Sequence, residues 1–177
     1  MAGPTLSGFL QFVRNTMGIT TAVLPDNSPW IQLALAVSLA IVNPDLASLA
    51  VPQVDSTGAS LNPGNPTIDS LYTQAVYNLA ADNLINYAQD VPDAPAVAGS
   101  GDPGLPFFQW TRKQLNINGF VPGLLQSSSD EGTSSSYVVQ DAAKMFTLKD
   151  LQNLKTIYGR TYLGIAQGFG PSPYGMS

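Results

Sequence analysis

Three glycines, Gly99, Gly101 and Gly104, match the spacing G-x-G-x-x-G, which in one class of folds binds the pyrophosphate of a dinucleotide. That site needs a strand before the glycines, a helix after them and an acidic residue about 20 positions further on. Here Ala-Pro-Ala precedes the glycines, Pro103 lies among them, and residues 119–129 contain no acid. We therefore interpret the segment as a loop and expect no cofactor.

The acidic residues offer two further kinds of chemistry. Asp90, Asp93 and Asp102 could bind calcium, but the alternating oxygen ligands, central glycine and closing glutamate of a calcium loop are missing. Two carboxylates could also hydrolyse a glycosidic bond, yet eleven Asp residues create carboxylate pairs in any fold. We expect solvated acids in turns, no metal site, no catalytic residue and no enzyme.

A basic pair, Arg112 and Lys113, lies beside the aromatic residues Phe107, Phe108 and Trp110. Cations among aromatic side chains can stack on single-stranded nucleic acid. Two cations are too few in a chain of net charge −5, since nucleic-acid binding needs a basic face. We expect no sequence-specific nucleic-acid binding, and favour a surface helix that contacts a protein partner.

Composition narrows the function further. The 177 residues include no His and no Cys, which excludes Ser-His-Asp and Cys-His catalysis, zinc sites and disulfides. Only 11% of residues are charged, against about 25% in ordinary soluble domains. The hydrophobic share of 44% is nevertheless sufficient for a core. We expect one domain, 1–177, whose polar but nearly uncharged surface is suited to contact with other proteins.

Hydrophobic periodicity predicts the elements that carry these residues. Helices are expected over 5–17, with Thr5 as N-cap, and over 29–42 and 67–88. The second of these is apolar almost all round, which indicates burial on every side, either in the chain's own core or against a neighbouring subunit. Its apolar run, 30–42, is too short to cross a bilayer, and Met1–Pro4 lacks a basic leader, so no membrane association is expected.

The second half of the chain is expected to begin with a long loop over 90–106 and a short helix over 107–115. Segments 121–127 and 134–139 flank a glycine-containing turn and predict a β-hairpin arm, 121–139. A last helix is expected from Thr147 to about residue 165, followed by a tail, 168–177. The fold class is therefore mainly α: a helical bundle of about four to five helices with a β-hairpin extension and a flexible C-terminal tail.

The stretch Tyr158-Gly159-Arg160-Thr161-Tyr162 lies inside the predicted last helix. A glycine within a helix costs about 1 kcal/mol relative to alanine, so it usually has a packing reason. Core tyrosines around a close-packing glycine would explain it. So would close approach of another helix at a subunit boundary.

The order of these segments resembles the head–tail adaptor (connector, or neck) proteins of tailed bacteriophages. The resemblance rests on the capped helix at Leu24–Pro44, the long helix at Ile68–Ala88, the Ser/Gly-rich hairpin at Leu124–Val139 and the string Thr-Ile-Tyr-Gly-Arg-Thr-Tyr-Leu at Thr156–Leu163. The chain departs from that family in two places. The long helix has Asp82 and Asn83 where a His is frequent, and the loop at 90–106 is an insertion.

The resemblance implies a ring, commonly a dodecamer, that docks on the portal protein, contacts the next neck or tail protein and passes DNA through its lumen. It places the protein in the virion, at the head–tail interface, after assembly in the host cytoplasm. Alternatives are another virion part (tail terminator, stopper or head decoration), a small glycan hydrolase, or a secreted interaction protein, against which the missing signal peptide weighs.

The predicted interface lies mainly on the hairpin arm and the tail, because neither carries enough apolar residues to bury itself without a partner. Residues of the Tyr-Gly-Arg stretch complete it. The predicted interface residues are Val121, Leu124, Leu125, Asp130, Glu131, Tyr137, Val139, Tyr158, Arg160, Tyr162, Phe169, Pro171 and Tyr174.

Overall fold

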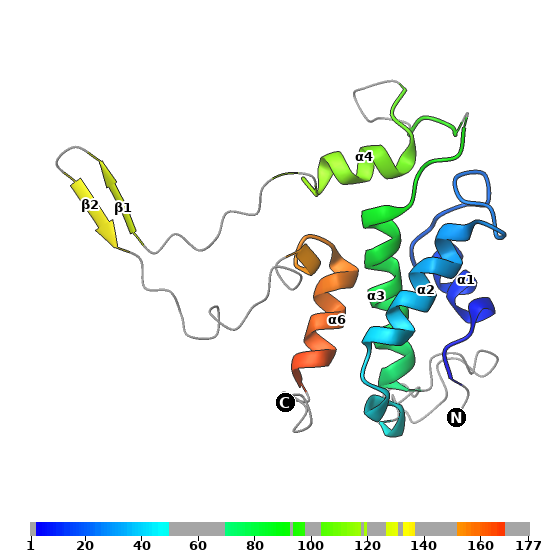
Figure 1. The fold of residues 1–177 in the computed structure, drawn as a ribbon. Helices are drawn as coiled ribbons and strands as arrows, with labels where there is room; N and C mark the ends of the chain where they lie inside the picture. The colour runs from blue at the N-terminus through cyan, green and yellow to red at the C-terminus, as the bar shows by residue number, and fades with distance from the viewer. Residues whose placement is uncertain are drawn as a thin grey trace, which may run out of the picture.

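The computed structural model describes residues 3–49, 70–92, 94–97, 104–117, 119, 127–130, 133–136 and 152–168. Within these residues the fold is mainly α, as expected, with five α-helices packed together (Figure 1). The helices are α1 (Leu6–Asn15), α2 (Pro29–Ile41), α3 (Leu71–Tyr87), α4 (Phe107–Gln114) and α6 (Ile157–Gly168), and a 3-10 helix, η1 (Pro44–Ser48), follows α2.

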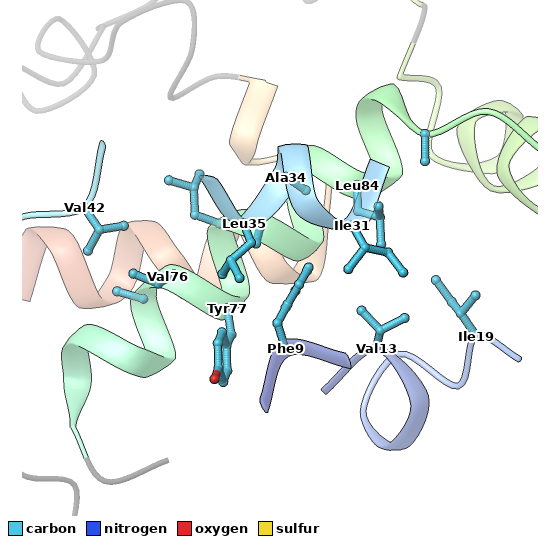
Figure 2. Close-up of a cluster of buried hydrophobic side chains, with 14 of the residues drawn as sticks. Phe9, Val13, Ile19, Ile31, Ala34, Leu35, Val42, Val76, Tyr77 and Leu84 are labelled. Atoms are coloured by element: carbon cyan, nitrogen blue, oxygen red, sulfur yellow. The ribbon is translucent and has the colours of Figure 1, made fainter. Parts of the chain in front are cut away.

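Helix α3 is the centre of the packing. Its residues from Ala75 to Ile85 are all buried, and α2 and α6 lie along two of its sides (Figure 1). Figure 2 shows Phe9 of α1 directed between α2 and α3, where its ring lies 5.8 Å from that of Tyr77. The main core therefore lies between α1, α2 and one side of α3. Helix α6 covers another side of α3.

The first helix is held at its start by α3. Thr5 is the N-cap, as predicted, and its Oγ1 accepts from the main-chain N–H of Gly8 at 3.1 Å. The hydroxyl of Tyr77 bonds to the N–H of Thr5 at 3.0 Å and to its carbonyl at 3.2 Å. Two of these bonds satisfy the N–H groups of Thr5 and Gly8, which the start of a helix leaves without main-chain partners.

The second helix has the predicted bounds to within one residue. Pro29 occupies the first turn, and Ser28 is the N-cap residue. The side chain of Ser28 makes no capping hydrogen bond, however, so the expected cap is formed by backbone geometry and Pro29 alone. Asn43 and Pro44 end α2 and begin η1, since proline cannot continue the α-helical hydrogen bonding.

One predicted helix start is wrong, and one predicted helix is interrupted. Helix α3 begins at Leu71 rather than 67, because Ser70 is extended and its Oγ accepts from the N–H of Thr73 at 3.2 Å. The predicted helix from Thr147 to residue 165 is interrupted by a turn at 154–156. Helix α6 begins after Thr156, whose Oγ1 accepts from the N–H of Gly159 at 2.8 Å. Residues 147–151 lie outside the described residues.

Strands β1 (Ser127–Asp130) and β2 (Thr133–Ser136) form an antiparallel pair inside the predicted hairpin range. Their register pairs Ser127 with Ser136 and Asp130 with Thr133. Residues 128–130 and 133, which the prediction placed in the turn, thus lie in the strands. The remaining residues of the predicted arm, and the tail from 169 to 177, lie outside the described residues.

Candidate interaction site

The outer face of α2 is the most apolar exposed surface among the described helices. Four large apolar side chains on it are substantially exposed: Leu33 (52%), Val37 (38%), Leu39 (39%) and Ile41 (42%). The helix contains no charged residue, and Gln32 is the only polar residue on the exposed side. Contiguous apolar surface of this kind is typical of a surface that binds another protein.

A groove of about 240 Å³ lies where this face meets the C-terminal end of α3. Trp30, Leu33 and Val37 line one wall. Leu84, Tyr87 and Ala88 line the other, and Tyr87 is 62% exposed. The groove can accept an apolar or aromatic side chain, since its lining is almost entirely hydrocarbon.

The described chain covers α2 on one side only, so burial of the other side against a neighbouring subunit stays a prediction. Only Ile31, Ala34, Leu35 and Ser38 of this helix are buried. They occupy the arc that packs on α1 and α3, because α3 can cover only one side of a neighbouring helix. Of the two predicted alternatives, burial in the chain's own core therefore accounts for one face, and the opposite face is open.

Of the predicted interface residues, three lie on α6. Arg160 is exposed, and its Nη1 donates to the carbonyl of Leu154 at 3.1 Å. Tyr158 and Tyr162 are half-buried, and Tyr162 packs against the core. The ring of Tyr158 meets Phe12 edge-on at 6.1 Å, and burial raises the pKa of its phenol. The two tyrosines therefore pack α6 against the rest of the bundle, and only part of each side chain is open to solvent.

The other predicted interface residues are not brought to this surface by any described element. Asp130 ends strand β1. The rest lie outside the described residues: Val121, Leu124, Leu125, Glu131, Tyr137, Val139, Phe169, Pro171 and Tyr174. The exposed face of α2 was absent from the predicted interface. The sequence did contain a signal for this face. A helix that is apolar all round has more apolar surface than the other helices of one protomer can cover.

Gly159 has a packing role, but inside the chain. A Cβ on this residue would lie 2.1 Å from the main-chain oxygen of Asn153. The glycine therefore allows the turn at 154–156 to pack against the first turn of α6. The predicted alternative, close approach at a subunit boundary, is wrong for this residue.

Several cations hold turns and helix ends together. Arg112 donates through Nε to the carbonyl of Ile85 at 2.8 Å and through Nη2 to that of Ala88. Burial lowers its pKa, and the charge of Asp90 opposes that shift. Asp90 in turn accepts from the N–H groups of Phe108 and Gln109 at 2.8 and 3.1 Å, at the start of α4. Arg112 thus caps the C-terminal end of α3, and contact of α4 with a protein partner stays a prediction.

Lys155 and Arg14 act in the same way. The Nζ of Lys155 donates to the carbonyls of Asn116, Ile117 and Gly119 at 2.7–2.9 Å, which ties the turn after α4 to the start of α6. Arg14 donates to two carbonyls of the following turn and pairs with Asp26 at 2.5 Å. Among the described residues, Arg14, Arg112 and Lys155 therefore stabilise turns and helix ends.

The long helix carries two buried polar residues where the resembled family often has His. Asp82 is 1% exposed and accepts hydrogen bonds from Thr156 and from Nδ2 of Asn86. Asn83 donates to the hydroxyl of Ser38 on α2 at 3.1 Å. One residue thus binds α6 to α3 and its neighbour binds α2 to α3. Asp82 is an exception to the expectation that the acids lie in turns and caps.

Over the described ranges, no group of three or more acidic, His or Cys side chains could hold a metal ion. The helices seen in these ranges also include none long and apolar enough to cross a membrane. Gly104, the last residue of the G-x-G-x-x-G match, has φ +120° in the loop before α4. Comparison with known protein families, curated proteins and solved structures gives no match.

Proposed function

We propose that the chain is a structural subunit of the neck of a tailed bacteriophage, an adaptor that forms a ring on the portal and links the head to the tail. The observation that carries the proposal is the exposed apolar face of α2, centred on Leu33 and Val37. Contiguous exposed apolar surface of this kind is typical of a protein that other proteins cover in its working state.

The use of charge supports an assembly role over turnover. Among the described residues, Arg14, Arg112 and Lys155 bond to main-chain carbonyls, and Asp90 caps a helix. Asp82, the buried acid, is closed off beneath α6. An enzyme keeps charged groups with shifted pKa values open to substrate in a cleft. The groove beside α2 is apolar and has no charged side chain in its lining. No observation therefore favours the glycan hydrolase alternative.

The helical character of the described fold favours an adaptor over a tail terminator, for which a β-rich fold is expected. In this proposal the hairpin extension (121–139) and the C-terminal tail (168–177) contact the portal, the neighbouring subunits and the next tail protein. Twelve subunits of net charge −5 would carry about −60. A like-charged lumen would keep DNA from adhering as it passes.

The proposal is tested by co-expressing the chain with the portal protein of its phage and measuring the mass of the complex by native mass spectrometry. A ring of this chain bound to the portal ring is expected. A chain that never joins the portal, with its helical content intact by circular dichroism, contradicts the proposal.

Deletion of residues 170–177 tests the role of the tail in the same assay. The truncated chain is expected to fold and to bind the portal at least tenfold more weakly. Its control is the full-length chain with Tyr174→Phe, which removes one hydroxyl and keeps the aromatic ring. Portal binding by the truncated chain at the strength of the full chain would remove the tail from the interface.

A further inference from the structure

The outer face of α6 has a feature that the isolated protomer does not explain. Ile157, Thr161, Gly164 and Gly168 follow one another at i, i+4, i+7 and i+11, and all four are exposed. Gly164 lies near the centre of this stripe, and a Cβ built on it meets nothing within 4 Å. Glycine in a helix interior is less stable than alanine, so a residue without a reason inside the chain points to a contact outside it.

The outer face of α2 has the complementary shape. Leu33 and Val37 project from it as a ridge, and the small residues Ala36 and Ala40 lie beside them, also exposed. A shallow face centred on glycine lets a second helix approach closely, and a ridge of large side chains fills the resulting groove. The α2 face thus supplies large side chains, and the α6 face supplies the space around Gly164 that could receive them.

Charge is compatible with this pairing. The α2 face has no charged residue, and the sequence of α6 contains one, Arg160, whose Nη1 is bonded to the carbonyl of Leu154. Depletion of charge at the centre is characteristic of protein interfaces. None of the residues on the α2 face or on the α6 stripe is itself charged.

The two faces are placed for a repeating contact. Helices α2 and α6 lie on different sides of α3 and run in the same direction, opposite to α3 (Figure 1). A rotation about an axis along the helices sets α2 of one copy beside α6 of the next with their directions matched. A contact between two different surfaces of the same chain is heterologous, and it closes into a ring when the rotation allows.

We propose that the α2 face (Leu33, Ala36, Val37 and Ala40) of one copy docks onto the α6 face (Ile157, Thr161, Gly164 and Gly168) of the next copy. This inference rests on the proposed ring and specifies the surfaces that form it. A 13-residue helix is about 20 Å long and 10 Å wide, a footprint of roughly 200 Å². Stable interfaces bury about 800 Å² on each partner, so the contact alone is weak and depends on concentration.

Cysteine cross-linking tests the pairing directly, because the chain contains no Cys. Two single variants of the full chain, Leu33→Cys and Gly164→Cys, are oxidised separately and as an equal mixture. A disulfide needs Cα atoms within about 7 Å, so it reports the proposed contact alone. Covalent dimers are expected in the mixture, at least tenfold more abundant than in either single variant.

Each other outcome has a distinct meaning. Dimers of Leu33→Cys alone indicate a two-fold α2–α2 contact and overturn the proposal. Protection of the Leu33→Cys thiol that is lost on deleting residues 170–177 shows that the chain's own tail covers the face, which also overturns it. Rings without the cross-link refute these surfaces and leave the proposed function standing. Cross-linked chains that fail to bind the portal support these surfaces and contradict the proposed function.

A second measurement separates assembly from folding. Val37→Asp and Leu6→Asp change side chains of equal exposure, 38% each, on different helices. Val37→Asp is expected to weaken self-association at least tenfold in sedimentation equilibrium, and Leu6→Asp to leave it within twofold. Gly164→Leu is expected to act like Val37→Asp, because it fills the groove. Equal effects of the two Asp variants would overturn the proposal.

Discussion

The hydroxyl of Thr156 donates a hydrogen bond to the carboxylate of Asp82, which lies 74 residues earlier in the chain. The same hydroxyl oxygen accepts from the N–H of Gly159 and caps the first turn of α6. Both side chains are 1% exposed, so these bonds form away from water. A buried carboxylate on the central helix therefore determines where the last helix begins.

Replacing Thr156 by Val is expected to lower the free energy of unfolding by about 2–4 kcal/mol. About 1 kcal/mol comes from the lost helix cap, and about 1–3 kcal/mol from a buried carboxylate short of a partner. Urea denaturation followed by circular dichroism measures the change. The control is Thr161→Val on the exposed side of α6, for which a change below about 0.5 kcal/mol is expected. Equal losses in the two variants would refute the role of Thr156.

Two of the three glycines of α6, Gly159 and Gly164, are expected to respond to alanine in opposite directions. Gly159→Ala forces a Cβ into the main chain of Asn153 and is expected to destabilise the fold by about 3 kcal/mol. Gly164→Ala meets open space and is expected to stabilise the protomer by about 0.5–1 kcal/mol. Thermal unfolding of both variants at low protein concentration is the measurement, and a shift in the same direction for both would contradict the structure.

Lys155→Met is expected to loosen the turn after α4, since it removes three hydrogen bonds to carbonyls while keeping most of the aliphatic stem. The expected loss is about 1–2 kcal/mol, discounted for partial exposure. Hydrogen exchange should become roughly tenfold faster at the amides of 115–117. The exposed Lys113→Met is the matched control, and the same acceleration there would show that charge alone matters.

Alkaline pH is expected to destabilise the fold through Tyr158. Because burial raises the pKa of this phenol in the folded state, the unfolded chain loses the proton first as pH rises. The contribution of Tyr158 to stability is therefore complete below about pH 10 and falls as pH increases through the folded-state pKa. Urea denaturation between pH 8 and 11 measures this slope. Tyr158→Phe should flatten it, whereas Tyr87→Phe, at an exposed position, should leave it unchanged.

Much of the helical architecture could be predicted because its signals are local. Thr5, Pro29 and the apolar spacing around Phe9 and Leu79 each act within one or two turns, and α1, α2 and α4 have nearly the expected bounds. At α3 the N-cap Ser70 is also a local signal, but the apolar spacing alone did not reveal it. The start of α6 could not be predicted from local patterns. At α6 the hydroxyl of Thr156 is selected by Asp82 on another helix, which no local pattern encodes.

The sequence by itself determined that the chain is mainly helical, poor in charge and without His or Cys, because composition, capping and periodicity need no tertiary contact. Only the tertiary structure decided which side of α2 is covered. A helix that is apolar all round has no periodic preference for one face, so the packing of α3 made the choice and left Leu33 and Val37 exposed. It likewise separated Gly159, packed against Asn153, from Gly164, where an added Cβ would meet open space.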